Sequence, residues 1–217
     1  MAQQLFERLF LLVPVWLSLS VHEWAHARAA FRLGDDTAAR LGRMTLNPLA
    51  HIDPIGTLLL PLLGVPFGWA RPVPIDPRRF DPSVNVARGM ALTAAAGPAS
   101  NFALSLGAIA LLAAIVHLSP DSVAGHALTV QLLYVFALIN AALGLFNLFP
   151  VVPLDGSRIA AALVPESLRP AWNAYARIGP LLLLALVLAP TLFGVSVLGW
   201  PIAKLRALLD ALVAVPQ

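Results

Sequence analysis

The residues of this 217-residue chain that are best suited to chemistry form the sequence His22-Glu23-Trp24-Ala25-His26. Two histidines four residues apart lie one turn apart on the same face of a helix, so both imidazoles can bind one zinc ion. The Glu23 carboxylate then lies beside the metal, where it can act as a general base. The same pattern arises by chance in soluble helices, and a histidine that only fills a core position is a common alternative. The motif therefore predicts a zinc-dependent hydrolytic site. Further evidence for this prediction must come from the surrounding sequence.

The composition indicates an integral membrane protein of one domain. Apolar residues make up 59% of the chain and charged residues 12%, and the mean hydropathy is +0.81. Soluble domains average about 45–50% apolar and about 25% charged residues, and disordered chains have low hydrophobicity. The chain has no cysteine, which excludes disulfides, thiolate zinc sites and a cysteine nucleophile. No basic run interleaved with aromatic residues supports nucleic-acid binding.

The depth of the motif in the membrane favours a functional site. His22 follows Leu5 by 17 residues, which is about 25 Å of helix at a rise of 1.5 Å per residue. Placing an ionisable side chain at such a depth in the membrane costs free energy, so residues of this kind are taken to be functional. A structural role in the core, with its ring nitrogens hydrogen-bonded, explains one buried histidine. It does not explain two histidines and a glutamate at one depth.

The uncharged stretches predict an all-α integral membrane protein with about four transmembrane helices in one polytopic domain, residues 1–217. The expected spans cover residues 5–33, 89–117, 127–150 and 178–200. Residues 42–75 are expected to be irregular or re-entrant at membrane level. Within them, residues 42–53 and 68–75 could pair as a short β-ribbon that offers an edge to an extended substrate, and a plain loop is an almost equal alternative. Residues 201–215 have the spacing of an interfacial helix.

The distribution of basic residues predicts the orientation. Residues 32–88 contain seven arginines and residues 150–177 contain three, whereas residues 118–127 contain none. By the positive-inside rule, both arginine-rich loops are cytoplasmic and both termini are outside. The histidine motif then lies towards the cytoplasmic side.

A catalytic zinc needs a third protein ligand, because such sites hold three protein ligands and one open position. The best candidate is Asp155, in the sequence Asn147-Leu-Phe-Pro-Val-Val-Pro-Leu-Asp-Gly156. The third span returns to the cytoplasmic side, so Asp155 arrives at the level of the two histidines. Pro150 and Pro153 cannot continue a regular helix and are expected to unwind this end. An alternative, which does not exclude the first, is that Asp155 caps a helix over residues 156–163.

Together these residues resemble the site-2 protease family of intramembrane zinc metalloproteases. The resemblance rests on His22-Glu23-x-x-His26, followed far downstream by Asn147-x-x-Pro150-x-x-Pro153-x-Asp155-Gly156. Residues 42–56 resemble the family's segment after the first catalytic helix, and Gly97-Pro-Ala-Ser-Asn101 resembles its Gly-Pro-x-x-Asn motif. The chain resembles a compact form, because residues 118–127 leave no room for a PDZ-like insertion and no nucleotide-sensing domain is seen after the fourth span.

The resemblance implies one zinc ion per chain and a set of site residues: His22, His26 and Asp155 as ligands, with Glu23 as the catalytic base. Asn147 in such proteins helps to hold the substrate backbone or the oxyanion. A similar role for Asn101 is the weaker of two interpretations, because its small neighbours also favour a helix contact.

The implied substrate is a single-span transmembrane protein, such as a membrane-tethered anti-sigma or transcription factor cut after an earlier trimming step. The implied location is a prokaryotic inner membrane. Two other classes compete with this interpretation: a membrane zinc carrier, and a catalytically silent scaffold of the same fold. A carrier is expected to show repeats, and the sequence has no second copy of the histidine helix. A silent scaffold is expected to have lost Glu23 or a ligand, and all are present.

Overall fold

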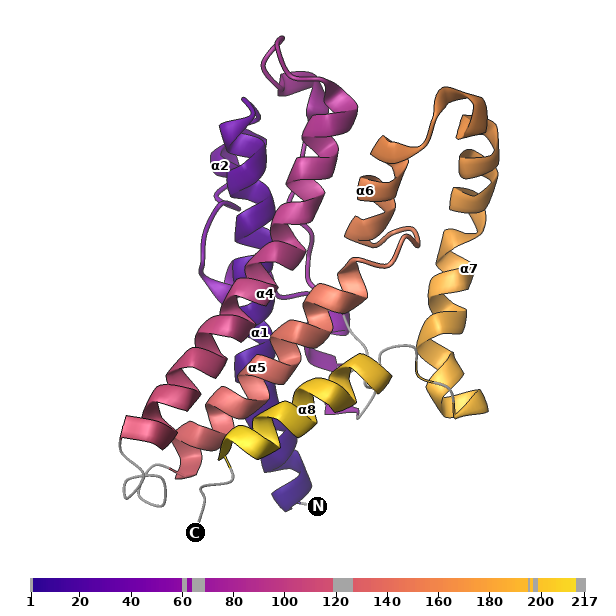
Figure 1. Ribbon diagram of the computed structural model, residues 1–217. Coiled ribbons are helices and arrows are strands. Elements are labelled where there is room, and N and C mark those ends of the chain that lie inside the picture. Colours follow the sequence, from indigo (N-terminus) through magenta and orange to yellow (C-terminus); the bar gives the residue numbers. More distant parts are fainter. Residues whose placement is uncertain are drawn as a thin grey trace.

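The computed structural model describes residues 2–59, 62–63, 69–118, 127–194, 196 and 199–213, with the side chains of residues 2–11, 58 and 127 left out. Its regular elements are helices, and no strand occurs among these residues (Figure 1). The α-helices are α1 (Ala2–Arg32), α2 (Thr37–Arg40), α4 (Val86–Leu118), α5 (Ala127–Asn147), α6 (Asp155–Leu163), α7 (Arg169–Phe193) and α8 (Gly199–Val213). Short 3₁₀ or π turns occupy Pro48–Ala50, Pro54–Leu59, Pro77–Arg79 and Glu166–Leu168. The all-α prediction is confirmed, and the β-ribbon is not.

Three helical stretches in the described residues are long and apolar enough to cross a membrane: Val86–Leu118, Leu128–Asn147 and Glu166–Phe193. The protein is therefore an integral membrane protein. The first predicted span falls on α1, whose 31 residues are about 46 Å long at 1.5 Å per residue. The predicted number of four spans stays a prediction, because α1 is not among the three.

Two helices differ in extent from the spans predicted for them. The last span was expected over residues 178–200, but α7 begins at Arg169 and ends at Phe193. A proline in its first turn favours the early start, and Gly194, at φ +66°, ends the helix in the left-handed conformation. The third span was expected to reach residue 150, but α5 ends at Asn147, because Pro150 lacks the N–H needed to continue the helix.

α4 and α5 pack through small residues, which brings their backbones close together. A Cβ atom added at Gly144 of α5 would lie 2.9 Å from the Phe102 ring of α4. The buried cluster beside this contact includes Ala108, Leu112 and Ala137. The close approach of α4 and α5 also brings buried polar residues of both helices against α1, which positions the site described below.

α8 packs against α4 and α5 in the structure, where the sequence suggested an interfacial helix over residues 201–215. Leu209 is fully buried in the α4–α5 cluster. The Tyr134 hydroxyl of α5 donates to Asp210 Oδ1 at 2.6 Å. In Figure 1, α8 crosses α4 and α5 near the end of the molecule where both chain termini lie.

The loop that follows α1 is fixed to the end of that helix by a buried carboxylate. Asp35 is 1% exposed, and it accepts hydrogen bonds from the backbone N–H groups of Thr37 at 2.9 Å and Asp76 at 2.7 Å. A hydrogen bond from the Arg78 side chain lowers the pKa of Asp76 below its ordinary value. The chain between these anchors runs back along α1, and its residues 69–75 become one wall of the site.

Candidate metal centre

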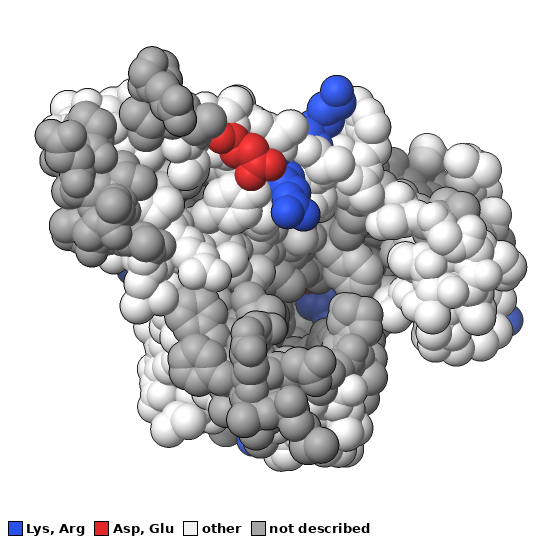
Figure 2. All heavy atoms as spheres, turned by 90° about the horizontal axis from the view of Figure 1, so that it is seen from below, with Lys and Arg blue, Asp and Glu red and all other residues white. Residues whose placement is uncertain are grey.

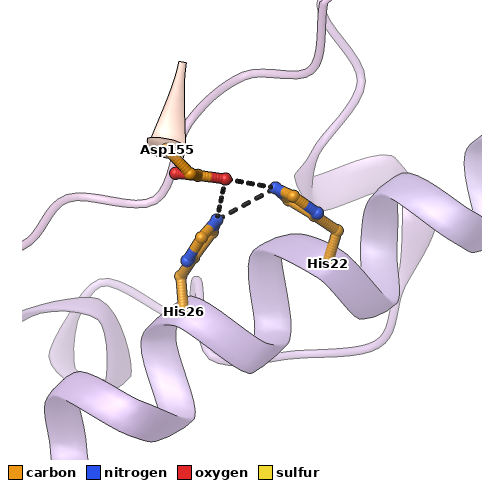
Figure 3. A group of neighbouring side chains, drawn as sticks. All are labelled: His22, His26 and Asp155. Atoms are coloured by element: carbon orange, nitrogen blue, oxygen red, sulfur yellow. Dashed lines mark hydrogen bonds and ion pairs between the residues drawn. The ribbon is translucent and has the colours of Figure 1, made fainter. Parts of the chain in front are cut away.

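The three predicted zinc ligands face one another (Figure 3). His22 and His26 come from α1, and Asp155 is the first residue of α6. The two Nε2 atoms are 2.9 Å apart, and Asp155 Oδ2 lies 3.1 Å from His22 Nε2 and 3.2 Å from His26 Nε2. None of the three side chains is more than 13% exposed.

Hydrogen bonds on the far side of each ring set the histidine tautomers. His26 Nδ1 lies 2.7 Å from the carbonyl oxygen of Thr93, which can only accept, so Nδ1 carries the proton. His22 Nδ1 lies 2.6 Å from Asn101 Oδ1 and donates to it. A neutral imidazole that is protonated at Nδ1 has an unprotonated Nε2. Both Nε2 lone pairs therefore point towards Asp155.

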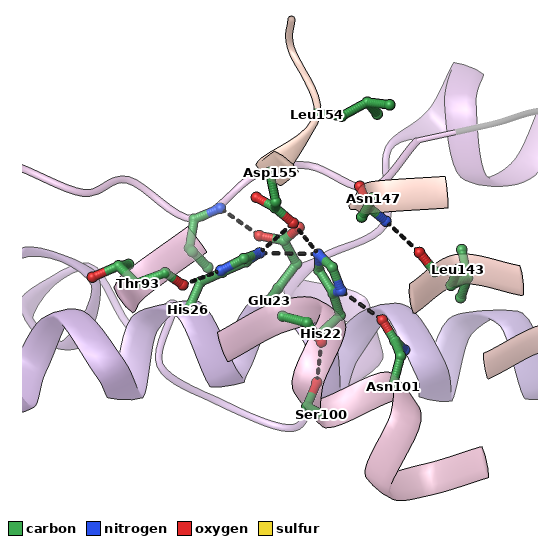
Figure 4. Close-up of polar contacts among 12 residues, drawn as sticks. His22, Glu23, His26, Thr93, Ser100, Asn101, Leu143, Asn147, Leu154 and Asp155 are labelled. Atoms are coloured by element: carbon green, nitrogen blue, oxygen red, sulfur yellow. Dashed lines mark hydrogen bonds and ion pairs between the residues drawn. The ribbon is translucent and has the colours of Figure 1, made fainter. Parts of the chain in front are cut away.

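A buried network fixes the orientation of the Asn101 amide, whose contact with His22 is drawn in Figure 4. Asn140 Nδ2 donates to the carbonyl oxygen of Phe136 at 2.9 Å and to Ser18 Oγ at 2.8 Å. Asn140 Oδ1 consequently accepts from Asn101 Nδ2 at 2.9 Å. Asn101 Oδ1 is left to face His22. Asn101, Asn140 and Ser18 are each 0% exposed, so every polar group here needs its partner.

The donor set fits a zinc ion. Two unprotonated nitrogens and a carboxylate oxygen converge, and Asp155 Oδ2 is buried without a well-oriented hydrogen bond. Such a convergence of acceptors is unfavourable unless a cation lies between them. Imidazole nitrogens and a carboxylate oxygen are the ligands of catalytic zinc. Their separations of 2.9–3.2 Å are close to the about 3.3 Å expected for tetrahedral ligands with bonds of 2.0–2.1 Å.

A tight turn brings Asp155 to the two histidines. The chain reverses after α5 through hydrogen bonds from Leu154 N to Val151 O and from Ser157 N to Leu154 O. Gly156 packs so closely on the end of α5 that a Cβ atom there would overlap the carbonyl of Leu148. Leu154 is the N-cap of α6, so the alternative in which Asp155 caps that helix does not hold in the structure.

Gly97 lets α4 pass directly behind the two histidines. A Cβ atom added at Gly97 would overlap the His26 ring and would lie 2.6 Å from His22 Cε1. The helix carries Asn101 one turn further on, which is the residue bonded to His22. The sequence Gly97-Pro-Ala-Ser-Asn101 therefore combines the space for the rings with the acceptor that orients one of them.

The candidate base Glu23 lies beside the three ligands in Figure 4. Its side chain is buried, and Oε2 accepts a hydrogen bond from the backbone N–H of Val73 at 2.8 Å. The second oxygen, Oε1, is the one that remains for a proton transfer.

A cavity of about 290 Å³ opens beside the ligands and the base. Its walls come from α1, the segment 69–75, α5, the turn before α6, α6 and α7. The lining residues are Leu19, His22, Glu23, His26, Trp69, Ala70, Pro72, Val73, Ile75, Leu143, Phe146, Asn147, Pro153, Leu154, Asp155, Arg158 and Leu183. Most are apolar, and the polar ones include the three ligands and Glu23, as in a reaction site with a hydrophobic approach.

Comparison with known proteins identifies the family of the chain. The model of peptidase family M50 matches residues 112–189. A Bacillus subtilis (strain 168) protein named "Putative zinc metalloprotease YwhC" is 38% identical over 193 residues, which cover 88% of this chain and 84% of the relative. The chain belongs to peptidase family M50, the site-2 proteases.

Two further M50 relatives are less similar to this chain. Proteins named "Putative zinc metalloprotease Rip2" from Mycobacterium tuberculosis (strain ATCC 25618 / H37Rv) and Mycolicibacterium smegmatis are 32% and 30% identical. The matches cover 85% and 84% of this chain and 69% and 68% of the relatives. No solved structure matches this M50 chain. Family membership makes it a membrane metalloprotease with a zinc cofactor.

Two further polar side chains line the M50 cavity. Asn147, predicted to support the substrate or the oxyanion, lines the cavity and donates from Nδ2 to Leu143 O at 3.0 Å. Arg158 also lines the cavity and was not predicted. Its position three residues after Asp155 on α6 was the available signal, because residues three apart share a helix face.

The Asn101 contact gives a test that is independent of proteolysis. In Asn101→Ala, His22 Nδ1 loses its acceptor and the ring can take the other tautomer, so we expect zinc affinity to fall about 10–100-fold. Chelator competition on the purified protein measures this. Ser105→Ala is the matched control, since Ser105 lies one turn further along α4 and bonds only to Ala137 O in the described contacts. Equal affinity of Asn101→Ala and the wild type would show that Asn101 does not orient the ligand.

Proposed function

We propose that this chain is an intramembrane zinc metalloendopeptidase that cuts a peptide bond in or near the transmembrane helix of a membrane-tethered protein. His22, His26 and Asp155 are the zinc ligands, and Glu23 is the general base. The observation that carries the proposal is the convergence of two imidazole nitrogens and a carboxylate oxygen on one buried point beside a glutamate. Glu23 has no evident role in a site that only binds or carries zinc.

The chemistry follows from the positions of these groups. Zinc, when bound, polarises the scissile carbonyl and makes water a competent nucleophile at neutral pH. Glu23 takes a proton from the attacking water at Oε1 and delivers it to the leaving amine. The buried Asn101 and Thr93 acceptors keep both histidines in the ligand tautomer. Asn147 has a second amide hydrogen, which we assign to the substrate backbone or the oxyanion.

A single-span transmembrane protein fits the approach to the site. Leu143 and Phe146 of α5 and Leu183 of α7 give the cavity apolar walls from two helices apolar enough to span a membrane. A helix in lipid must unwind locally before a peptide bond can reach the ligands. We place regulators such as membrane-tethered anti-sigma or transcription factors, cut after an earlier trimming step, in this substrate class.

We propose a cytoplasmic-side active site in a prokaryotic inner membrane, with one polytopic domain over residues 1–217 and both termini outside. The basic residues support this orientation, because ten arginines lie in the two segments at the site end. Figure 2 looks onto the opposite end, and few charged side chains appear among the described atoms of that face. The chain ends at this face also lie together in Figure 1.

The proposal is tested with a panel of single-span proteins in proteoliposomes that contain the zinc-loaded protein. Mass spectrometry of the products locates the cut. We expect cleavage within the transmembrane segment or at its edge, and only for membrane-inserted substrates. Cleavage confined to soluble, unfolded polypeptides would contradict the proposed substrate class, and zinc transport without cleavage would favour the carrier.

A further inference from the structure

Pro72 and Val73 line the cavity, and Pro74 follows them in the chain. Proline has no backbone N–H, so Val73 carries the only backbone donor of this tripeptide. That single donor is bonded to Glu23 Oε2 at 2.8 Å in a buried contact. The single backbone N–H of residues 72–74 is therefore used on the base.

The position of this N–H is fixed by the backbone around it. The proline rings restrict φ at residues 72 and 74, and a residue before proline is held in an extended conformation. The N–H of Arg71 bonds to His51 O at 2.9 Å on one side, and the N–H of Asp76 bonds to the buried Asp35 on the other. The tripeptide is therefore held at both ends.

Side chains hold the segment against α1 as well. The Val73 side chain is 7% exposed and packs with Ala27 of α1 and Ala38 of α2. Arg43 Nη2 donates to the carbonyl oxygens of Arg71 at 2.7 Å and Pro72 at 3.3 Å. Those carbonyls are consequently engaged within the protein.

We propose that Val73 is a positioning residue for catalysis, and that its backbone N–H holds Oε2 of Glu23 so that Oε1 faces the reacting water. This inference rests on the proposed function of Glu23 as the base. Residues 72–74 themselves have no free backbone N–H to offer to an extended substrate. The one N–H is used on Glu23, and the carbonyl oxygens of Arg71 and Pro72 accept hydrogen bonds from Arg43.

Val73→Pro removes the N–H, and Val73→Ala keeps it while shortening the side chain. In proteoliposomes with a cleavable substrate, we expect kcat of Val73→Pro to fall about 10–100-fold below that of Val73→Ala, with KM and zinc content similar in both. A rise in KM with kcat unchanged would instead identify the segment as a substrate edge and overturn the proposal. Equal kcat in the two variants would also overturn it.

A second measurement keeps the inference separate from the proposed function. Hydrogen exchange at the Val73 amide, the only exchangeable backbone site between Pro72 and Pro74, is followed in the wild type and in Glu23→Ala. We expect exchange about tenfold or more faster in Glu23→Ala. Equal exchange would show that Glu23 does not hold this amide, whether or not the wild type cleaves a substrate or Val73→Pro folds. Failure of the wild type to cleave, with the exchange difference intact, would count against the proposed function alone.

Discussion

Replacing Glu23 with glutamine is expected to cause a severe loss of cleavage activity while the protein still binds one zinc ion per chain. Glutamine has nearly the same shape, and its carbonyl oxygen can still accept the Val73 N–H, so the site keeps its structure. The amide cannot take up a proton as the carboxylate does. A positioned general base contributes about 10²–10⁴-fold, and we expect kcat to fall by that factor.

The measurement is single-turnover cleavage in proteoliposomes together with zinc analysis of the same samples. Glu166→Gln is the matched control, because Glu166 is exposed at the start of the turn Glu166–Leu168, away from the cavity lining. The control is expected to cleave as the wild type does. Cleavage by Glu23→Gln at the wild-type rate would rule out Glu23 as the base and would reduce the Val73 contact to a structural one.

Gly97→Ala is expected to remove zinc from the protein. The added methyl group would overlap the His26 ring and approach the His22 ring, so both rings must leave the positions in which they face Asp155. Overpacking of a well-packed interior costs about 1–3 kcal/mol, and displaced ligands lower metal affinity further. We expect zinc affinity to fall at least about 100-fold, with activity lost in parallel.

Gly107→Ala is the control for this experiment, since Gly107 lies in the same helix and a Cβ atom there meets nothing within 4 Å. It is expected to bind zinc normally and to be equally or slightly more stable, because alanine favours a helix over glycine. Chelator competition and thermal unfolding of both variants distinguish loss of the site from loss of the fold. Normal zinc affinity in Gly97→Ala would mean that the two histidines do not bind the metal together.

The ligand group could be anticipated from the sequence because two simple regularities place it. Helix periodicity puts His22 and His26 on one face, and the alternation of spans brings Asp155 to the same depth. The structure brings these three residues together. The contacts that Val73 and Gly97 make at the site depend on backbone geometry, which the residue types do not reveal.

Val73 illustrates this limit. Its contribution is a backbone N–H, which every residue except proline has, and only the flanking Pro72 and Pro74 mark it as unusual. The close approach of Gly97 to the histidines likewise depends on how α4 crosses α1. A glycine in a motif does not reveal which atoms lie behind it.

Boundaries and packing partners were the least predictable features of the fold. The arginines at 169 and 177 suggested that the last span begins after them, yet both lie within α7. The apolar residues of α8 predicted a contact with an apolar environment, which lipid and another helix satisfy equally. Leu209 is buried between helices, and only tertiary structure distinguishes these alternatives.

The central claim is that His22, His26 and Asp155 hold one zinc ion, and it is tested most directly by the metal content and X-ray absorption spectrum of the purified wild-type protein. We predict one zinc per chain, bound by two imidazole nitrogens and oxygen at about 2.0–2.2 Å. Asp155→Ala should bind it markedly more weakly. A wild-type protein without zinc after reconstitution, or a zinc ion whose spectrum lacks imidazole ligands, would contradict the account.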